Sequence, residues 1–167
     1  MNKYKILVAS DSHGRVDMLM EAISRNPDLD AVIFLGDGIS DMEFVSQYFR
    51  ARACAWYAVK GNCDFERIFR DAPLEKTQLL EIGGKRILYT HGDAYGVKLG
   101  MEELYSLAER SRADIVLYGH THRRSEEYRF GKYFVNPGSL HSGEFGRTCA
   151  ILTIDGDSVL FSYLMLA

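Results

Sequence analysis

Short apolar runs recur along the chain, and five of them predict buried strands that end beside a residue able to bind a metal ion. The runs cover residues 6–9, 31–35, 54–59, 86–90 and 115–118. They lead into Asp11 and His13, Asp37, Asn62, His91, and the pair His120 and His122. Ligands of open α/β sheets gather outside the carboxyl ends of the strands, so we expect these side chains to meet in one pocket.

The spacing of Asp11 and His13 gives the first local signal for such a pocket. Residues two apart on an extended chain project to the same side, so both can reach one point beyond the strand. Gly14 then allows the backbone to turn sharply away. The pair alone is a weak signal, because aspartate and histidine are also ordinary loop residues; the repeated spacing of His120 and His122 strengthens it.

Helical periodicity alternates with the strands in the first half of the chain. Apolar residues at positions 16, 19, 20 and 23 predict a helix that ends at Asn26-Pro27. A second apolar stripe at positions 42, 45 and 49 predicts another helix, with Ser40 as a candidate cap. The order β-α-β-α-β predicts parallel strands joined by right-handed crossovers.

The second half is richer in strands. A short helix is predicted over 66–70, ended by Pro73, and a longer one over 101–108. Glycine-containing turns predict three hairpins, which pair 77–82 with 85–90, 125–130 with 132–135, and 148–154 with 159–165. We therefore expect a single domain over 1–167 of the mixed α/β (α+β) class: a four-layer sandwich of two mixed β-sheets flanked by helices.

The composition is ordinary for a soluble domain and argues against several kinds of partner. The 167 residues are 47% hydrophobic and 26% charged, with a formal net charge of −3 and a pI of about 5.9. This balance gives no strong signal for nucleic acid or for anionic membranes. No apolar stretch is long enough to span a bilayer, and the N-terminus lacks a signal-peptide pattern. The three cysteines form no Cys-x-x-Cys pair, which indicates reduced thiols and a cytoplasmic location.

Seven side chains form the predicted set of metal ligands. They are Asp11, His13, Asp37, Asn62, His91, His120 and His122. Seven ligands exceed what one four-coordinate ion uses, and they fit two ions that share a carboxylate. Asp37 is the natural bridge, because each of its two oxygens can bind one ion. Nitrogen and oxygen ligands favour two divalent transition-metal ions, with manganese as the first candidate and nickel, iron or zinc as alternatives.

Such a pair of ions defines a reaction class. Two ions about 3.5–4 Å apart act as a clamp for in-line displacement at phosphorus, and they neutralise the charge that develops on the phosphoryl oxygens. We therefore expect hydrolysis of a phosphoester by in-line attack of a metal-bridging hydroxide. Asp37 and Asn62 are the predicted catalytic residues, since Asn62 is a neutral ligand that keeps the ions electrophilic.

The order of these motifs resembles the calcineurin-like metallophosphoesterases, and within them a small single-domain phosphodiesterase branch. The motifs are Asp11-x-His13, Gly36-Asp37, Gly61-Asn62-Cys63-Asp64, His91, Gly119-His120-Thr121-His122 and Asn136-Pro137-Gly138-Ser139. The resemblance implies a β-sandwich flanked by helices and a two-metal site. It also implies that one ion is bound by Asp11, His13, Asp37 and His122, and the other by Asp37, Asn62, His91 and His120.

Two positions depart from the pattern of the family. Many relatives place a histidine that donates a proton to the leaving group where this chain has Cys63. A thiol of ordinary pKa is a poor donor, which points to another acid, to water, or to substrates with good leaving groups. The second departure is Asp93, which either accepts a hydrogen bond from a ligating histidine or lines the cleft.

Other polar residues near these motifs have simpler interpretations. Asp64 is interpreted as a structural turn acceptor, and His141 as a surface or cleft-rim residue rather than a ligand. Arg123 and Arg124 either contact the substrate phosphate or are solvated charges at a strand edge, which is the more common outcome for such residues.

The sequence thus predicts a metal-dependent phosphodiesterase that acts on a small phosphoester substrate, with no membrane partner. One alternative is a non-catalytic metal-binding or protein-interaction scaffold of the same fold. The other is a nuclease or a cyclic-nucleotide phosphodiesterase, and the acidic pI weighs against a processive nuclease. Assembly into a homo-oligomer is left open by the sequence.

Overall fold

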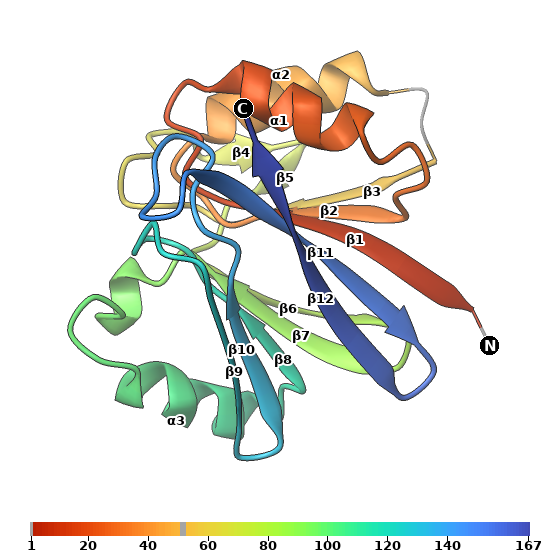
Figure 1. Ribbon diagram of the computed structural model, residues 1–167. Helices are drawn as coiled ribbons and strands as arrows, with labels where there is room; N and C mark the ends of the chain where they lie inside the picture. The colour runs from red at the N-terminus through yellow and green to blue at the C-terminus, as the bar shows by residue number, and fades with distance from the viewer. Residues whose placement is uncertain (1, 51–52) are drawn as a thin grey trace.

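The computed structural model describes residues 2–50 and 53–167, and two five-stranded sheets face each other within it (Figure 1). The first sheet has the order β12-β11-β1-β2-β3. Its strands are β1 (Lys3–Ala9), β2 (Ala31–Phe34), β3 (Ala55–Ala58), β11 (Arg147–Asp155) and β12 (Ser158–Leu166). The strands β1, β2 and β3 are parallel, as predicted, and β11 adds to β1 in the antiparallel direction.

The second sheet has the order β6-β7-β8-β10-β9. Its strands are β6 (Thr77–Ile82), β7 (Lys85–Thr90), β8 (Ile115–Leu117), β9 (Ser125–Arg129) and β10 (Lys132–Asn136). The three inner strands are parallel, and the two edge strands are antiparallel to their neighbours. All three predicted hairpins are present, so both sheets are mixed.

Helices cover the outer faces of the two sheets. The first sheet is covered by α1 (Val16–Ser24) and α2 (Ile39–Tyr48), and the second by α3 (Glu102–Ser111) (Figure 1). A short 3-10 helix, η1 (Asp93–Tyr95), follows β7. The layers run helix, sheet, sheet, helix, which confirms the predicted fold class.

The alternation of side chains along β1 shows how the layers are held together. Ile6 and Val8 are buried between the two sheets, against residues such as Ile115 of β8. Leu7 points the other way, into the core beneath α1 and α2. Both faces of this strand are apolar because it is covered on both sides, as expected of a buried parallel strand.

Two local predictions are wrong. Residues 66–70 form no helix: β4 (Ile68–Phe69) pairs with β5 (Ala72–Pro73) in a small hairpin. Its turn places Arg70 and Asp71 at φ +47° and +66°, a conformation that closes tight hairpins and excludes a helix. Ser40 is not the cap of α2 either, because it lies inside that helix, whose first N–H groups bond to Asp64 instead.

The loops that follow the parallel strands gather at one edge of the molecule, on the left in Figure 1. Backbone hydrogen bonds link them, including Asp11 N to the Gly36 carbonyl at 3.0 Å within the first sheet, and His141 N, in the loop after β10 of the second sheet, to the Asp11 carbonyl at 3.1 Å. The edges of both sheets therefore contribute to one site. No helix of the described residues is long and apolar enough to cross a membrane.

Candidate metal centre

The loops that carry the predicted ligands have an unusual backbone. Five of the seven ligands have positive φ values: Asp11 (55°), His13 (42°), Asp37 (56°), His120 (68°) and His122 (58°). Residues other than glycine rarely adopt this left-handed conformation, and such strain collects at functional sites. The surrounding structure must therefore fix these loops.

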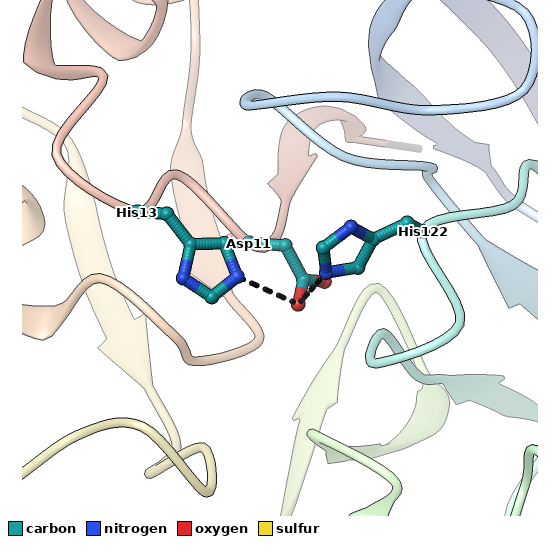
Figure 2. Close-up of side chains that lie close together, drawn as sticks. All are labelled: Asp11, His13 and His122. Carbon is teal, nitrogen blue, oxygen red and sulfur yellow. Dashed lines mark ion pairs between the residues drawn. The ribbon is translucent and has the colours of Figure 1, made fainter.

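Asp11 lies at the centre of the first ligand group, shown in Figure 2. Its Oδ2 accepts hydrogen bonds from Ser10 Oγ at 2.5 Å and from His120 N at 3.1 Å. Its Oδ1 is buried and has no hydrogen-bond partner among the described residues. This oxygen lies 3.1 Å from His122 Nε2 and 3.8 Å from His13 Nε2. A buried carboxylate oxygen that faces two imidazole nitrogens without a hydrogen bond is well suited to a cation.

His91 lies at the centre of the second group. Its Nδ1 is 2.8 Å from the carbonyl oxygen of Leu35, which can only accept, so Nδ1 carries the proton. In the neutral ring Nε2 is then an acceptor, and it faces Asn62 Oδ1 at 3.1 Å and Asp37 Oδ2 at 3.3 Å. His120 Nδ1 lies 3.2 Å from the same nitrogen. Acceptors that converge on one point need a positive charge between them, which a metal ion would supply.

Asp37 lies between the two groups. Its Oδ2 is 3.3 Å from His91 Nε2 and 3.7 Å from His13 Nε2, whereas its Oδ1 accepts a hydrogen bond from Cys63 N at 2.8 Å. One oxygen was expected at each ion, but the single oxygen Oδ2 faces both groups, because Oδ1 accepts the hydrogen bond from Cys63 N. Asp37 therefore lies between the two groups, and its role as a bridging ligand stays a prediction.

All seven predicted ligands come together, and a further side chain joins them. Ligand atoms within 4.8 Å of one another form the groups Asp11, His13, His122; Asp37, His91, His120; and His13, Asp37, Cys63. The first two groups match the two ion sites implied by the resemblance, and Asn62 extends the second. Cys63, which was not predicted as a ligand, offers its sulfur at the junction of the two groups.

The carboxylates of the centre are strongly favoured in their charged form. Burial alone would raise the pKa of Asp11, but His122 and His13 outweigh it and hold that pKa well below its usual range. Burial would also raise the pKa of Asp37, but the interaction with His91 outweighs burial, so the pKa of Asp37 is lowered as well. Both carboxylates are therefore available as anionic ligands at neutral pH.

The histidines respond to these negative charges in two ways. The nearby Asp11 carboxylate, with Oδ1 3.8 Å from His13 Nε2, raises the pKa of His13. Burial would lower the pKa of His91, but Asp37 and Asp11 raise it overall. Burial and the charge of His91 lower the pKa of His120. The carboxylates thus favour the protonated forms of His13 and His91 when no metal is bound.

Asp64 supports Asp37 through the backbone. Its carboxylate is buried and accepts hydrogen bonds from the N–H groups of Asp37, Gly38, Ile39 and Gly61 at 2.8–2.9 Å. The interpretation of this residue as a structural acceptor is confirmed. One carboxylate thus joins the loops after β2 and β3 to the start of α2.

Asp41 supports the first group and was missed by the sequence analysis. Its Oδ2 accepts hydrogen bonds from Ser12 Oγ at 2.6 Å and from Gly14 N at 2.8 Å, which fixes the turn after β1. The available signal was its spacing, because it lies one helical turn after Asp37 at the start of a predicted helix.

The motif Asn136-Pro137-Gly138-Ser139, which begins at the last residue of β10, was given no role from the sequence, and it supports the centre from the other side. Asn136 Nδ2 donates to the Gly119 carbonyl at 2.9 Å and to Thr121 Oγ1 at 3.0 Å. Ser139 Oγ donates to the Asp11 carbonyl at 3.0 Å. These bonds explain how both strained ligand loops keep their conformation.

The remaining candidates lie around the centre rather than in it. His141 is exposed, and its ring lies edge-on to His13 with centroids 5.7 Å apart, so it is a rim residue. Arg123 pairs with Glu144 at 3.4 Å, and Arg124 lies over the ring of Tyr163 at 4.8 Å. Each arginine thus has a partner within the protein.

Asp93 contacts Lys76 rather than a ligand. Its Oδ2 is 3.2 Å from Lys76 Nζ, and its Oδ1 is buried without a hydrogen-bond partner among the described residues. No hydrogen bond from a ligating histidine reaches it within the described part of the chain. The structure therefore does not support the first interpretation of this residue, a hydrogen bond from a ligating histidine.

Comparison with known proteins places the chain in a family. The calcineurin-like phosphoesterase superfamily domain matches residues 4–157, and the chain belongs to this superfamily. This membership confirms the resemblance seen in the motifs, and the phosphoesterase class agrees with the two ligand groups.

Individual relatives narrow the comparison to a small phosphoesterase branch. The chain is 38% identical to the probable metallophosphoesterase YsnB of Bacillus subtilis over 157 residues, which are 92% of this chain and 86% of that protein. A Streptococcus pneumoniae structure described as a predicted phosphoesterase matches with a TM-score of 0.81 at 29% identity, over 99% of this chain and 91% of that one. A structure described as a novel archaeal phosphodiesterase matches with a TM-score of 0.78 at 26% identity, over 97% and 99% of the two chains.

Proposed function

We propose that this protein is a two-metal phosphodiesterase that hydrolyses a small phosphoester. The observation that carries the proposal is the position of Asp37 Oδ2, which lies 3.3 Å from a nitrogen of one ligand group and 3.7 Å from a nitrogen of the other. Two divalent ions bound in these groups would stabilise phosphoryl charge and lower the pKa of water for in-line attack. The similarity to a protein described as an archaeal phosphodiesterase supports the diester as substrate.

The residues of the chain divide the remaining tasks. Asp37 carries the negative charge shared by both groups, and its loop is fixed by Asp64. Asn62 brings a neutral amide oxygen to within 3.1 Å of His91 Nε2, so it adds a ligand without reducing the positive charge at the centre. These two roles are the basis for naming Asp37 and Asn62 as catalytic.

Cys63 sets a limit on the leaving group. It is exposed, and partial desolvation of the sulfur together with the nearby Asp37 raises the pKa of the thiol. A thiol with a raised pKa is a poor general acid. We therefore expect the enzyme to prefer esters whose leaving group departs as a stable anion, such as aryl esters.

The decisive experiment compares Asp37→Ala with Asp157→Ala, a substitution of the same type at a fully exposed aspartate. Each protein is loaded with Mn²⁺ and assayed with bis(p-nitrophenyl) phosphate, and circular dichroism checks its fold. We expect Asp37→Ala to lose more than about a hundredfold in kcat, because the shared carboxylate would hold the ions that stabilise the charge of the transition state. We expect a chelator to abolish turnover in the wild type. Full turnover by Asp37→Ala, or turnover that resists the chelator, would contradict the proposal.

A substrate and metal panel separates the alternatives. Preferred cleavage of cyclic nucleotides would favour a cyclic-nucleotide phosphodiesterase, and preferred cleavage of short oligonucleotides would favour a nuclease. Two bound metal ions with no turnover of any ester would favour the scaffold. Elemental analysis of protein purified without added metal tests manganese against nickel, iron and zinc.

The three cysteines are free, which supports the cytoplasmic location that we propose.

A further inference from the structure

A pocket of about 500 Å³ adjoins the metal centre on the side of the second sheet. Thr121, which separates the ligands His120 and His122 in the sequence, forms part of its wall. Val97 and Tyr118, both at least 93% buried, give it an apolar lining. Its volume is in the range of small-molecule sites, so it can accept one arm of an ester whose phosphate lies at the centre.

Two cations, Lys98 and Arg123, line the same pocket. Arg123 has Glu144 as a partner, but Lys98 has no ion pair or hydrogen bond among the described residues. An unpaired cation beside a centre built for two further cations is unfavourable until an anion occupies the space between them.

We propose that this pocket is a substrate subsite for an ester arm that combines an aromatic or apolar body with a second negative charge. The body contacts Val97 and Tyr118, and the charge lies beside Lys98 and Arg123. The proposal rests on the proposed phosphodiesterase function and specifies its substrate class: a phosphodiester with an additional anionic group, such as a carboxylate or a second phosphate, on one arm.

The test uses two diesters that differ only at that arm: p-nitrophenyl phenyl phosphate and p-nitrophenyl 4-carboxyphenyl phosphate. Both release p-nitrophenolate, so the reacting bond is the same. The wild type should favour the carboxylate in kcat/KM by about fivefold, the ratio expected for a partly exposed charge pair of about 1 kcal/mol. Lys98→Gln should reduce the ratio to near one, and Lys98→Glu should invert it. The control is Lys85→Gln, which removes a lysine at the start of β7, the end of the strand that lies away from His91 and the metal centre. This variant should leave the ratio unchanged.

Several results would overturn the subsite. Equal kcat/KM values for the two diesters in the wild type would overturn the proposal. A Lys98→Gln variant that keeps the fivefold preference would also overturn it. A Lys85→Gln variant that loses the preference would show a general effect of net charge. If neither diester is hydrolysed, the proposed function fails, and calorimetric Kd values for the same intact pair test the subsite separately. The same fivefold ratio, lost in Lys98→Gln, would then support it, and equal Kd values would refute it.

Discussion

Replacement of Asp64 by asparagine tests whether one carboxylate fixes the loop that carries the bridging ligand. Asp64 Oδ1 accepts hydrogen bonds from Gly38 N at 2.8 Å and Ile39 N at 2.9 Å, and Oδ2 accepts from Asp37 N and Gly61 N at 2.8 Å each. An asparagine keeps one oxygen but puts an NH₂ donor in place of the other. Two buried N–H groups then face a donor, in either orientation of the amide.

The expected loss of stability follows from these four hydrogen bonds. A buried donor that loses its acceptor costs about 1–3 kcal/mol, and the lost charge also sat at the N-terminus of α2, where it interacts favourably with the helix dipole. We expect Asp64→Asn to reduce the free energy of unfolding by roughly 2–4 kcal/mol. For a chain of this length that lowers the melting temperature by roughly 5–15 °C.

The assay is urea and thermal unfolding of the metal-free protein, so that metal binding does not contribute to the measured stability. Asp157→Asn is the matched control, since that side chain is fully exposed and should change the free energy by less than about 0.5 kcal/mol. A loss below about 1 kcal/mol in Asp64→Asn would refute the reasoning. Titration with Mn²⁺ then shows whether the loosened Asp37 loop also weakens binding.

Three further predictions concern sterics, protons and thiols. A Cβ at Gly61 would lie 2.5 Å from Asp37 N and would also overlap the Asp37 carboxylate, so Gly61→Ala should weaken Mn²⁺ binding by more than tenfold in calorimetry; unchanged affinity would contradict the observed packing. The raised pKa values of His13 and His91 mean that a metal must displace their protons, so Mn²⁺ affinity should rise with pH, by up to about tenfold per unit for each displaced proton, until the pH exceeds both values. An affinity that falls or stays constant between pH 6 and 8 would refute this linkage. Burial raises the pKa of Cys149 to about 12, so mass spectrometry should find this thiol unmodified by a maleimide until urea unfolds the protein.

The elements that the sequence predicted well are those with a local pattern. The hairpin of β6 and β7 has the predicted bounds, 77–82 and 85–90, because its alternation and its Gly83-Gly84 turn are both written in neighbouring residues. The segment 66–70 was predicted wrongly for the converse reason. Its hairpin turn uses Arg70 and Asp71 in a left-handed conformation that their side chains do not signal.

In the candidate site, too, features with a local sequence pattern could be predicted, and features that depend on distant contacts could not. The ligands could be predicted because each follows an apolar strand. The cap of α2 could not, because its acceptor comes from Asp64, more than twenty residues away, rather than from Ser40. The placement of Asp37 Oδ2 toward both groups depends on a hydrogen bond to the other oxygen, and only the tertiary structure contains that bond.

Each ligand group draws residues from both sheets. Asp11 and His13 follow a strand of the first sheet, whereas His122 follows a strand of the second; Asp37 meets His91 in the same way. Ions bound there would act as cross-links between the two halves of the sandwich, and at a hundred times their Kd they would add about 2.7 kcal/mol per site to its resistance to unfolding. Metal starvation would then reduce the lifetime of the protein as well as its catalytic output.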